Sequence, residues 1–75
     1  MILNIDQLRA FYAAAKSRCI TRTADELMVT PPAITMQIKQ LEKAVSIRFL
    51  VRDGNTIHLT NTGEAVFEKA EKIFH

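Results

Sequence analysis

One face of the segment between Pro32 and Lys43 carries side chains that can read base pairs. At about 100° per residue on a helix, the side opposite Ile34 holds a hydroxyl, an amide, two ammonium groups and apolar tips. These side chains belong to Pro32, Thr35, Met36, Lys39, Gln40 and Lys43. Hydroxyls, amides and small apolar groups can distinguish base edges in a DNA groove, and lysine can bond guanine or a phosphate. The face therefore predicts a surface that reads DNA.

The opposite side of this segment should face a core. Its apolar residues are Ile34 and, within about 40° of it on the helix, Ile38, Leu41 and Val45. In a helix-turn-helix the first part of the second helix approaches the bases, so the residues expected to lie deepest are Pro32, Thr35, Met36 and Lys39. Lys43, one turn later, is expected to meet a phosphate. A polar helix face is usually only solvated, and the neighbouring elements must decide between the two interpretations.

Basic residues outside this face could contact phosphates. Thr21 and Arg22 begin the preceding predicted helix, where free N–H groups and the helix dipole favour an anion. Arg52 lies in a predicted hairpin and could reach an adjacent backbone or the minor groove. From Lys16 to Arg52 seven bases face three acids, whereas from Asp53 onward four acids face two bases. Attraction to a polyanion therefore belongs to the middle of the chain.

The residues that most often perform catalysis or bind metals are sparse. His58 and His75 lie in a predicted strand and at the chain end, without paired acids at a useful spacing. Cys19 is the single cysteine, so it can form no internal disulfide and no thiolate zinc site. We expect no catalytic residues, no metal and no cofactor, and we expect that the protein is not an enzyme.

Bulk composition indicates one small globular domain. The chain has 75 residues, 48% of them hydrophobic and 24% charged, with a net charge of +2. No apolar stretch approaches the roughly 18 residues of a membrane span, and the N-terminus lacks a signal-peptide layout. We therefore expect a cytoplasmic protein that does not interact with membranes.

Four helices and one hairpin are predicted to position these residues. The first helix spans Ile5–Arg18 with Asn4 as its cap, and the second begins after a Thr21 cap and stops near Met28. Thr30 caps a third helix that starts on two prolines and continues to Val45. The runs 48–52 and 56–59 flank the turn Asp53-Gly54-Asn55 and predict a hairpin.

The last predicted helix follows a Thr60 cap and carries an apolar stripe. Its members are Gly63, Val66, Phe67, Ala70, Ile73 and Phe74. The stripe exceeds what a small core needs, so we expect its part from Val66 to Phe74 to form a two-fold contact with a second copy. The helical pattern reaches the chain end without a stop signal, which predicts that the sequence is a fragment.

These elements predict a mainly α fold, a winged helix-turn-helix with a three-helix core, a two-stranded β wing and a C-terminal linker helix. Residues 1–59 would form the DNA-binding domain and residues 60–75 the start of the dimerisation helix. The alternative is a winged helix that serves protein–protein assembly, although the outer face of the third helix has no large apolar patch. RNA is disfavoured because its A-form major groove is too narrow for such a helix.

The sequence resembles the N-terminal domain of LysR-type transcriptional regulators over essentially all 75 positions. The runs that carry the resemblance are Ile5 to Phe11, Thr21 to Leu27, Thr30 to Glu42, Arg48 to Arg52 and Leu59 to Gly63. Three positions depart from it. Pro31 stands where the family often has glutamine or serine, and Met36 stands where it often has arginine. Asn55 stands where the wing often has a second basic residue.

The resemblance implies bacterial transcription regulation through an interrupted inverted repeat near a promoter. It implies base contacts from the recognition helix, capping or phosphate contacts from Thr21, Arg22 and Thr30, and a wing arginine at Arg52. Pro31 and Gln40 lie within the matching helix and are expected to contact DNA as well. It further implies a homodimer formed through the last helix, and a small-molecule effector that acts only through a C-terminal domain absent from this chain.

Overall fold

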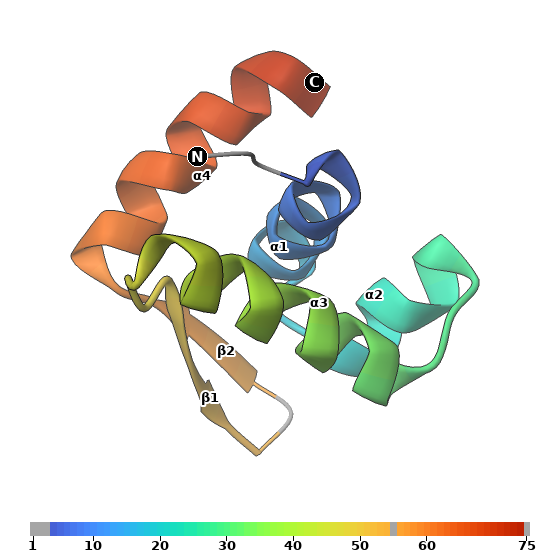
Figure 1. Ribbon diagram of the computed structural model, residues 1–75. Coiled ribbons are helices and arrows are strands. Elements are labelled where there is room, and N and C mark those ends of the chain that lie inside the picture. Colours follow the sequence, from blue (N-terminus) through green and yellow to red (C-terminus); the bar gives the residue numbers. More distant parts are fainter. Residues whose placement is uncertain (1–3, 55, 75) are drawn as a thin grey trace.

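A computed structural model describes residues 4–54 and 56–74 of the chain. The elements follow in the order α1 (Ile5–Ser17), α2 (Ile20–Leu27), α3 (Pro31–Val45), β1 (Leu50–Asp53), β2 (Thr56–Leu59) and α4 (Asn61–Phe74) (Figure 1). The predicted mainly α architecture with a two-stranded wing is confirmed. The predictions that involve Asn55 and His75 lie outside the described residues.

The two ends of the first helix agree with the sequence to within one residue. The Asn4 side chain accepts hydrogen bonds from the N–H groups of Asp6 and Gln7, at 2.8 and 3.2 Å. Ser17 is the last helical residue, and Arg18 adopts a left-handed conformation with φ 60° as the cap. The inner side of α1 is buried along most of its length, so this helix forms the centre of the core.

The start of α2 differs from the prediction, which was wrong to place the cap at Thr21. The helix begins at Ile20, with Cys19 in the capping position. The Ser17 hydroxyl accepts from the Cys19 N–H at 3.1 Å, and the buried Thr23 hydroxyl donates to the Cys19 carbonyl at 2.9 Å. These bonds start the helix two residues earlier than predicted and allow Ile20 to enter the core, where it is almost fully buried.

The connection between α2 and α3 is short, as a helix-turn-helix requires. Met28 ends α2 in a left-handed conformation and is exposed, so it does not belong to the buried side of the helix. Thr30 caps α3 as predicted, because its hydroxyl accepts from the Ala33 N–H at 3.3 Å. Pro31 and Pro32 occupy the first turn, where a missing N–H leaves no partner unsatisfied.

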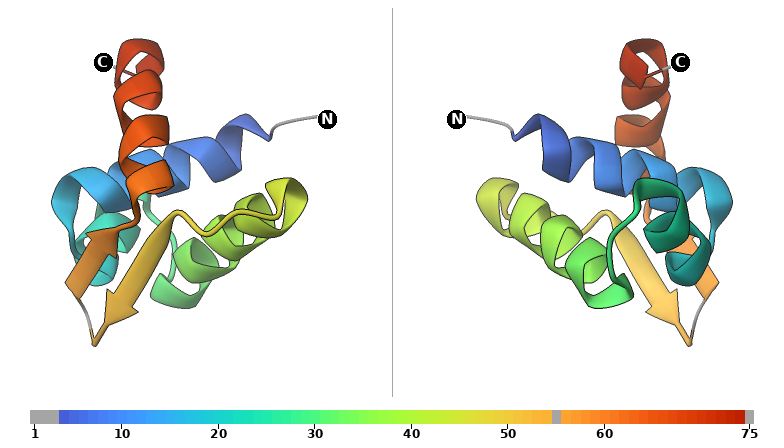
Figure 2. Two further views of the ribbon diagram at one scale, coloured as in Figure 1. Left: turned by 90° about the vertical axis from the view of Figure 1, so that its left-hand side faces the viewer. Right: turned by 90° about the vertical axis from the view of Figure 1, so that its right-hand side faces the viewer.

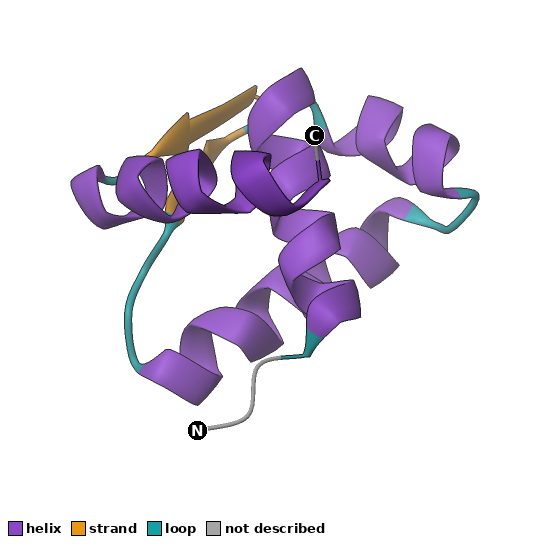
Figure 3. Cartoon of the chain, turned by 90° about the horizontal axis from the view of Figure 1, so that it is seen from above, coloured by secondary structure: helices purple, strands orange, loops and turns teal. Residues whose placement is uncertain are grey.

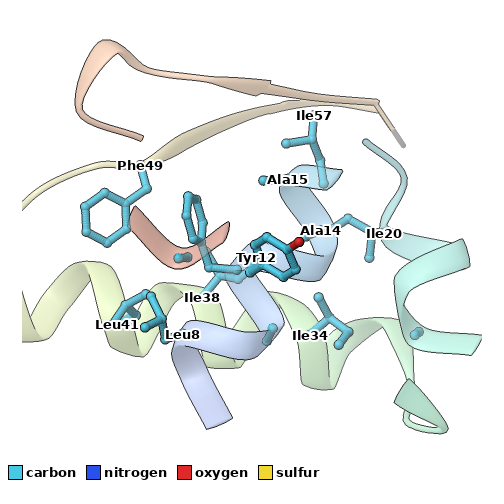
Figure 4. Packing of buried hydrophobic residues seen from close by; sticks show 14 residues of the cluster. Leu8, Tyr12, Ala14, Ala15, Ile20, Ile34, Ile38, Leu41, Phe49 and Ile57 are labelled. Carbon is cyan, nitrogen blue, oxygen red and sulfur yellow. The ribbon is translucent and has the colours of Figure 1, made fainter. Parts of the chain in front are cut away.

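The core lies between α1, α3 and the wing, with α2 closing one end (Figure 4). The largest apolar side chains that are fully buried are Phe11, Ile20, Ile34, Leu41 and Ile57. The rings of Phe11 and Phe49 lie 5.3 Å apart in a tilted arrangement. Because Ile34 and Leu41 are buried here, α3 can turn only one face to the outside.

The wing is an antiparallel hairpin that begins two residues later than predicted. Its register pairs Leu50 with Leu59 and Asp53 with Thr56, and Gly54 adopts φ 62° in the turn. Ahead of the strand, the Glu42 carboxylate accepts from the N–H groups of Phe49 and Leu50, at 2.7 and 3.3 Å. Through these two hydrogen bonds the Glu42 side chain connects α3 to the start of the wing.

The fourth helix stands against α1 and projects from the end of the molecule opposite the wing tip (Figures 2 and 3). The predicted Thr60 cap is confirmed, since its hydroxyl accepts from the Gly63 N–H at 2.9 Å. Phe67 and Phe74 each place their rings 5.4 Å from the ring of Tyr12. None of the helices in the described part of the chain is long and apolar enough to cross a membrane.

Ala70 corrects the predicted dimer surface. Its side chain is 1% exposed and packs in the chain's own core, so it is unavailable to a second copy. Phe67 and Phe74 are partly used in the same way, because they pack on Tyr12. Ile73, by contrast, is 60% exposed and remains on the outside of the helix.

Candidate nucleic-acid interface

The outward face of α3 and the wing together form a concave surface, and the hollow that it lines has a volume of about 500 Å³. Its lining residues are Pro31, Pro32, Thr35, Met36, Lys39, Gln40, Lys43 and Arg52. Seven of them come from α3 and one from β1, which runs beside that helix (Figure 2). The structure thus brings together eight of the residues that the sequence singled out for DNA contact. We call this set the α3 concave surface.

The α3 concave surface is accessible to a ligand because one side of α3 is buried in the core and the other side is exposed. Ile34 and Ile38 on the inner side are 1% and 2% exposed, whereas Met36 on the outer side is 56% exposed. Lys39 and Lys43 are also exposed. The chain therefore leaves uncovered the side of α3 that was predicted to face a groove.

The charge of the surface is uniformly positive at its ionisable positions. Lys39, Lys43 and Arg52 supply three cationic groups, and no carboxylate is among its lining residues in the described chain. The acid nearest in sequence, Glu42, turns to the wing main chain instead. A concave surface with only cations favours a polyanionic ligand.

Arg52 joins the wing to α3 through a contact that sequence reasoning did not predict. Its Nη1 donates to the Thr35 hydroxyl at 3.0 Å, and its Nε donates to the Gly54 carbonyl at 3.0 Å. The Thr35 hydroxyl in turn donates to the Pro31 carbonyl at 3.4 Å. The predicted phosphate contact from Arg52 and base contact from Thr35 thus start from side chains that are bonded to each other.

Gln40 makes a second unpredicted contact. Its Oε1 accepts from Gln7 Nε2 at 3.0 Å, which connects the start of α1 with the middle of α3. The two residues lie 33 positions apart in the chain, so no local spacing could have indicated the bond. The contact leaves the amide N–H groups of Gln40 as its remaining donors toward the concave surface.

Three predicted residues do not line the α3 concave surface. Thr21 and Arg22 lie exposed in the first turn of α2, and Thr30 caps α3 at its margin. Their predicted phosphate contacts stay predictions. No group of three or more histidine, cysteine, aspartate or glutamate side chains suited to a metal ion occurs within residues 4–54 and 56–74.

Three helices, a tight α2–α3 turn and a hairpin beside α3 define a winged helix-turn-helix protein. The family described as "Bacterial regulatory helix-turn-helix protein, lysR family" matches residues 5–64, and this chain belongs to it. The family predicted from the sequence is confirmed.

Curated relatives share this region with the chain. The RuBisCO operon transcriptional regulator of Allochromatium vinosum is 37% identical over 73 residues, which are 97% of this chain and 24% of that protein. The RuBisCO operon transcriptional regulator of Acidithiobacillus ferrooxidans is 40% identical over 70 residues, or 93% of this chain and 23% of that protein. The chain thus spans about a quarter of the length of these relatives.

Solved structures agree with the fold. The CbnR DNA-binding domain in complex with DNA superposes with a TM-score of 0.88 at 34% identity, covering 95% of this chain and 82% of that one. The BenM DNA-binding domain on its catB site 1 DNA gives a TM-score of 0.87 at 28% identity, covering 95% and 76%. Both neighbours are DNA complexes of isolated domains.

Proposed function

We propose that this chain is the DNA-binding part of a transcriptional regulator and that it binds duplex DNA in a sequence-specific manner. The observation that carries the proposal is the open, cationic α3 concave surface, formed by the outer side of a helix that a helix-turn-helix presents to DNA. Two structural neighbours with DNA bound support it.

In this proposal the first half of α3 enters the major groove. Thr35, Met36 and Lys39 approach the bases, because the recognition helix of this motif contacts base edges through its N-terminal residues. Lys43, one turn later, and Arg52 on the wing bind phosphates. Thr21 and Arg22 add a phosphate contact at the start of α2.

The proposal includes a homodimer formed through α4. Ile73 is exposed, and the half-buried Val66, Phe67 and Phe74 extend its apolar surface. A two-fold contact here would place two recognition helices about 34 Å apart or a multiple of it, the repeat of the major groove on one side of DNA. The chain catalyses no reaction in this role and works in the cytoplasm.

Salt dependence of duplex binding tests the proposal. The 75-residue chain is titrated into a fluorescently labelled random-sequence DNA duplex pool, and anisotropy is recorded at several salt concentrations. Because binding releases condensed counterions, the log–log slope should be about −0.9 for each phosphate neutralised. Bound duplexes are then amplified and sequenced, and they should converge on two half-sites.

A double-stranded RNA of equal length is the control, because its narrow major groove excludes α3. Equal affinity for both duplexes, or DNA binding without a salt response, would contradict the proposal. A chain that binds neither duplex would instead favour a winged helix that serves protein assembly.

A further inference from the structure

The polar group of Thr35 is engaged before any ligand arrives. Its hydroxyl donates to the Pro31 carbonyl, with 3.4 Å between the two oxygens, and accepts from Arg52 Nη1 at 3.0 Å. Donating to a base would break the first bond. Without breaking a hydrogen bond, Thr35 can offer its methyl group and the second lone pair of its hydroxyl oxygen.

Three further residues at this end of the α3 concave surface are apolar, whereas Arg52 contacts the Thr35 hydroxyl from the wing. Pro31, Pro32 and Met36 line this surface and are exposed, and none of their side chains carries a hydrogen-bond donor. The first cation along α3 is Lys39, one turn beyond Thr35. The part of the recognition helix nearest its N-terminus is therefore an apolar surface, beside a cationic one.

We infer that this chain selects its DNA site through thymine C5-methyl groups, which contact Met36 and the methyl group of Thr35. The inference rests on the proposed function and specifies the chemistry that is read. In the major groove thymine alone among the four bases presents a methyl group, and apolar side chains distinguish it from cytosine. Arg52 acts as a positioning residue, because its bond to the Thr35 hydroxyl holds that side chain in place on the α3 concave surface.

The expected effect of one methyl group is modest and measurable. Removing a buried CH₂-sized group from an apolar contact weakens an equilibrium about fourfold. Deoxyuridine differs from thymidine only by this methyl group and pairs with adenine in the same way. A duplex with one thymine replaced by deoxyuridine therefore isolates the contact.

The experiment uses the 75-residue chain and a duplex recovered from the random pool, with its thymines replaced one at a time. At one or more positions in each half-site, the replacement should raise Kd about fourfold. Met36→Ala, or Thr35→Ser, which retains the hydroxyl and loses the methyl group, should abolish this ratio at one such position. Thr35→Val, which retains a methyl group in place and loses the hydroxyl, should keep the ratio.

Lys43→Ala is the matched control, because it should weaken the thymine and deoxyuridine duplexes equally. A ratio of one at every thymine of a duplex that binds with the expected salt slope would overturn the inference and leave the proposed function standing. The inference is also overturned if Met36→Ala and Thr35→Ser both keep the ratio at every thymine, because neither side chain would then contact a methyl group. A chain that binds no DNA duplex overturns both.

Discussion

Replacing Gly63 by alanine should destabilise the fold by about 3 kcal/mol or more, although alanine is the better helix former. A Cβ at this buried position would lie 1.8 Å from the Phe49 carbonyl oxygen and 2.8 Å from its carbon. That carbonyl accepts from the Thr60 N–H at 3.0 Å, so it is held in place by the start of α4. Main chain cannot yield as the tip of a flexible side chain can, and the clash outweighs the gain in helix propensity of about 1 kcal/mol.

Thermal or urea unfolding of the G63A variant measures this effect. Ala65 lies exposed two residues further along α4, and Ala65→Gly is the control for propensity alone, with an expected cost of about 1 kcal/mol. If Gly63→Ala matched or exceeded the stability of the original chain, the close packing of α4 on the loop before the wing would be contradicted.

Reversing the charges of Lys39 and Lys43 should reduce DNA affinity on the order of a hundredfold and leave the melting temperature nearly unchanged. Each Lys→Glu substitution removes an attraction to a phosphate and adds a repulsion, which together are worth about 1–2 kcal/mol near a surface. Both side chains are exposed, so little packing is lost. Anisotropy with the selected duplex at low salt measures the change.

The control variant changes the net charge by the same amount, on a different surface of the protein. Lys16 and Lys72 lie together with Glu68 and Glu71 on a surface formed by α1 and α4. Lys16→Glu with Lys72→Glu should lower affinity far less, because only the general field of the protein changes there. Equal losses in the two double variants would contradict a specific role for the outer side of α3.

Local patterns predicted which residues form the α3 concave surface because this surface is mostly one side of one helix. Once Ile34, Ile38 and Leu41 are assigned to a core, helical geometry alone determines which residues face outward. The Thr30 cap and the prolines that follow it determine where that helix begins. Burial on one side and exposure on the other then follow from sequence spacing.

Contacts between distant segments could not be predicted in the same way. The bonds from Arg52 to Thr35 and from Gln7 to Gln40 join residues 17 and 33 positions apart, and they depend on how the elements pack. An exposed polar residue gives no signal of its partner.

The predictions of the α2 start and of Ala70 as a dimer residue were wrong for related reasons. Thr21 was predicted as the cap because its side chain carries a hydroxyl. However, Ile20 lies one turn before Ala24 on the same apolar side of the helix, which indicates an earlier start. On α4, periodicity identified an apolar stripe but could not divide it between the chain's own core and a second copy. Burial makes that division, and it places Ala70 inside.

Chemical-shift mapping tests most directly whether the outer side of α3 is the surface that meets DNA. The ¹⁵N-labelled chain is titrated with the duplex recovered from the random pool, and amide shifts are followed for residues 4–74. We predict that the largest changes occur from Thr35 to Lys43 in α3 and at Arg52 in the wing, with α4 changing little at its inner side. Changes confined to α4 and the facing side of α1, with α3 unaffected, would contradict the account.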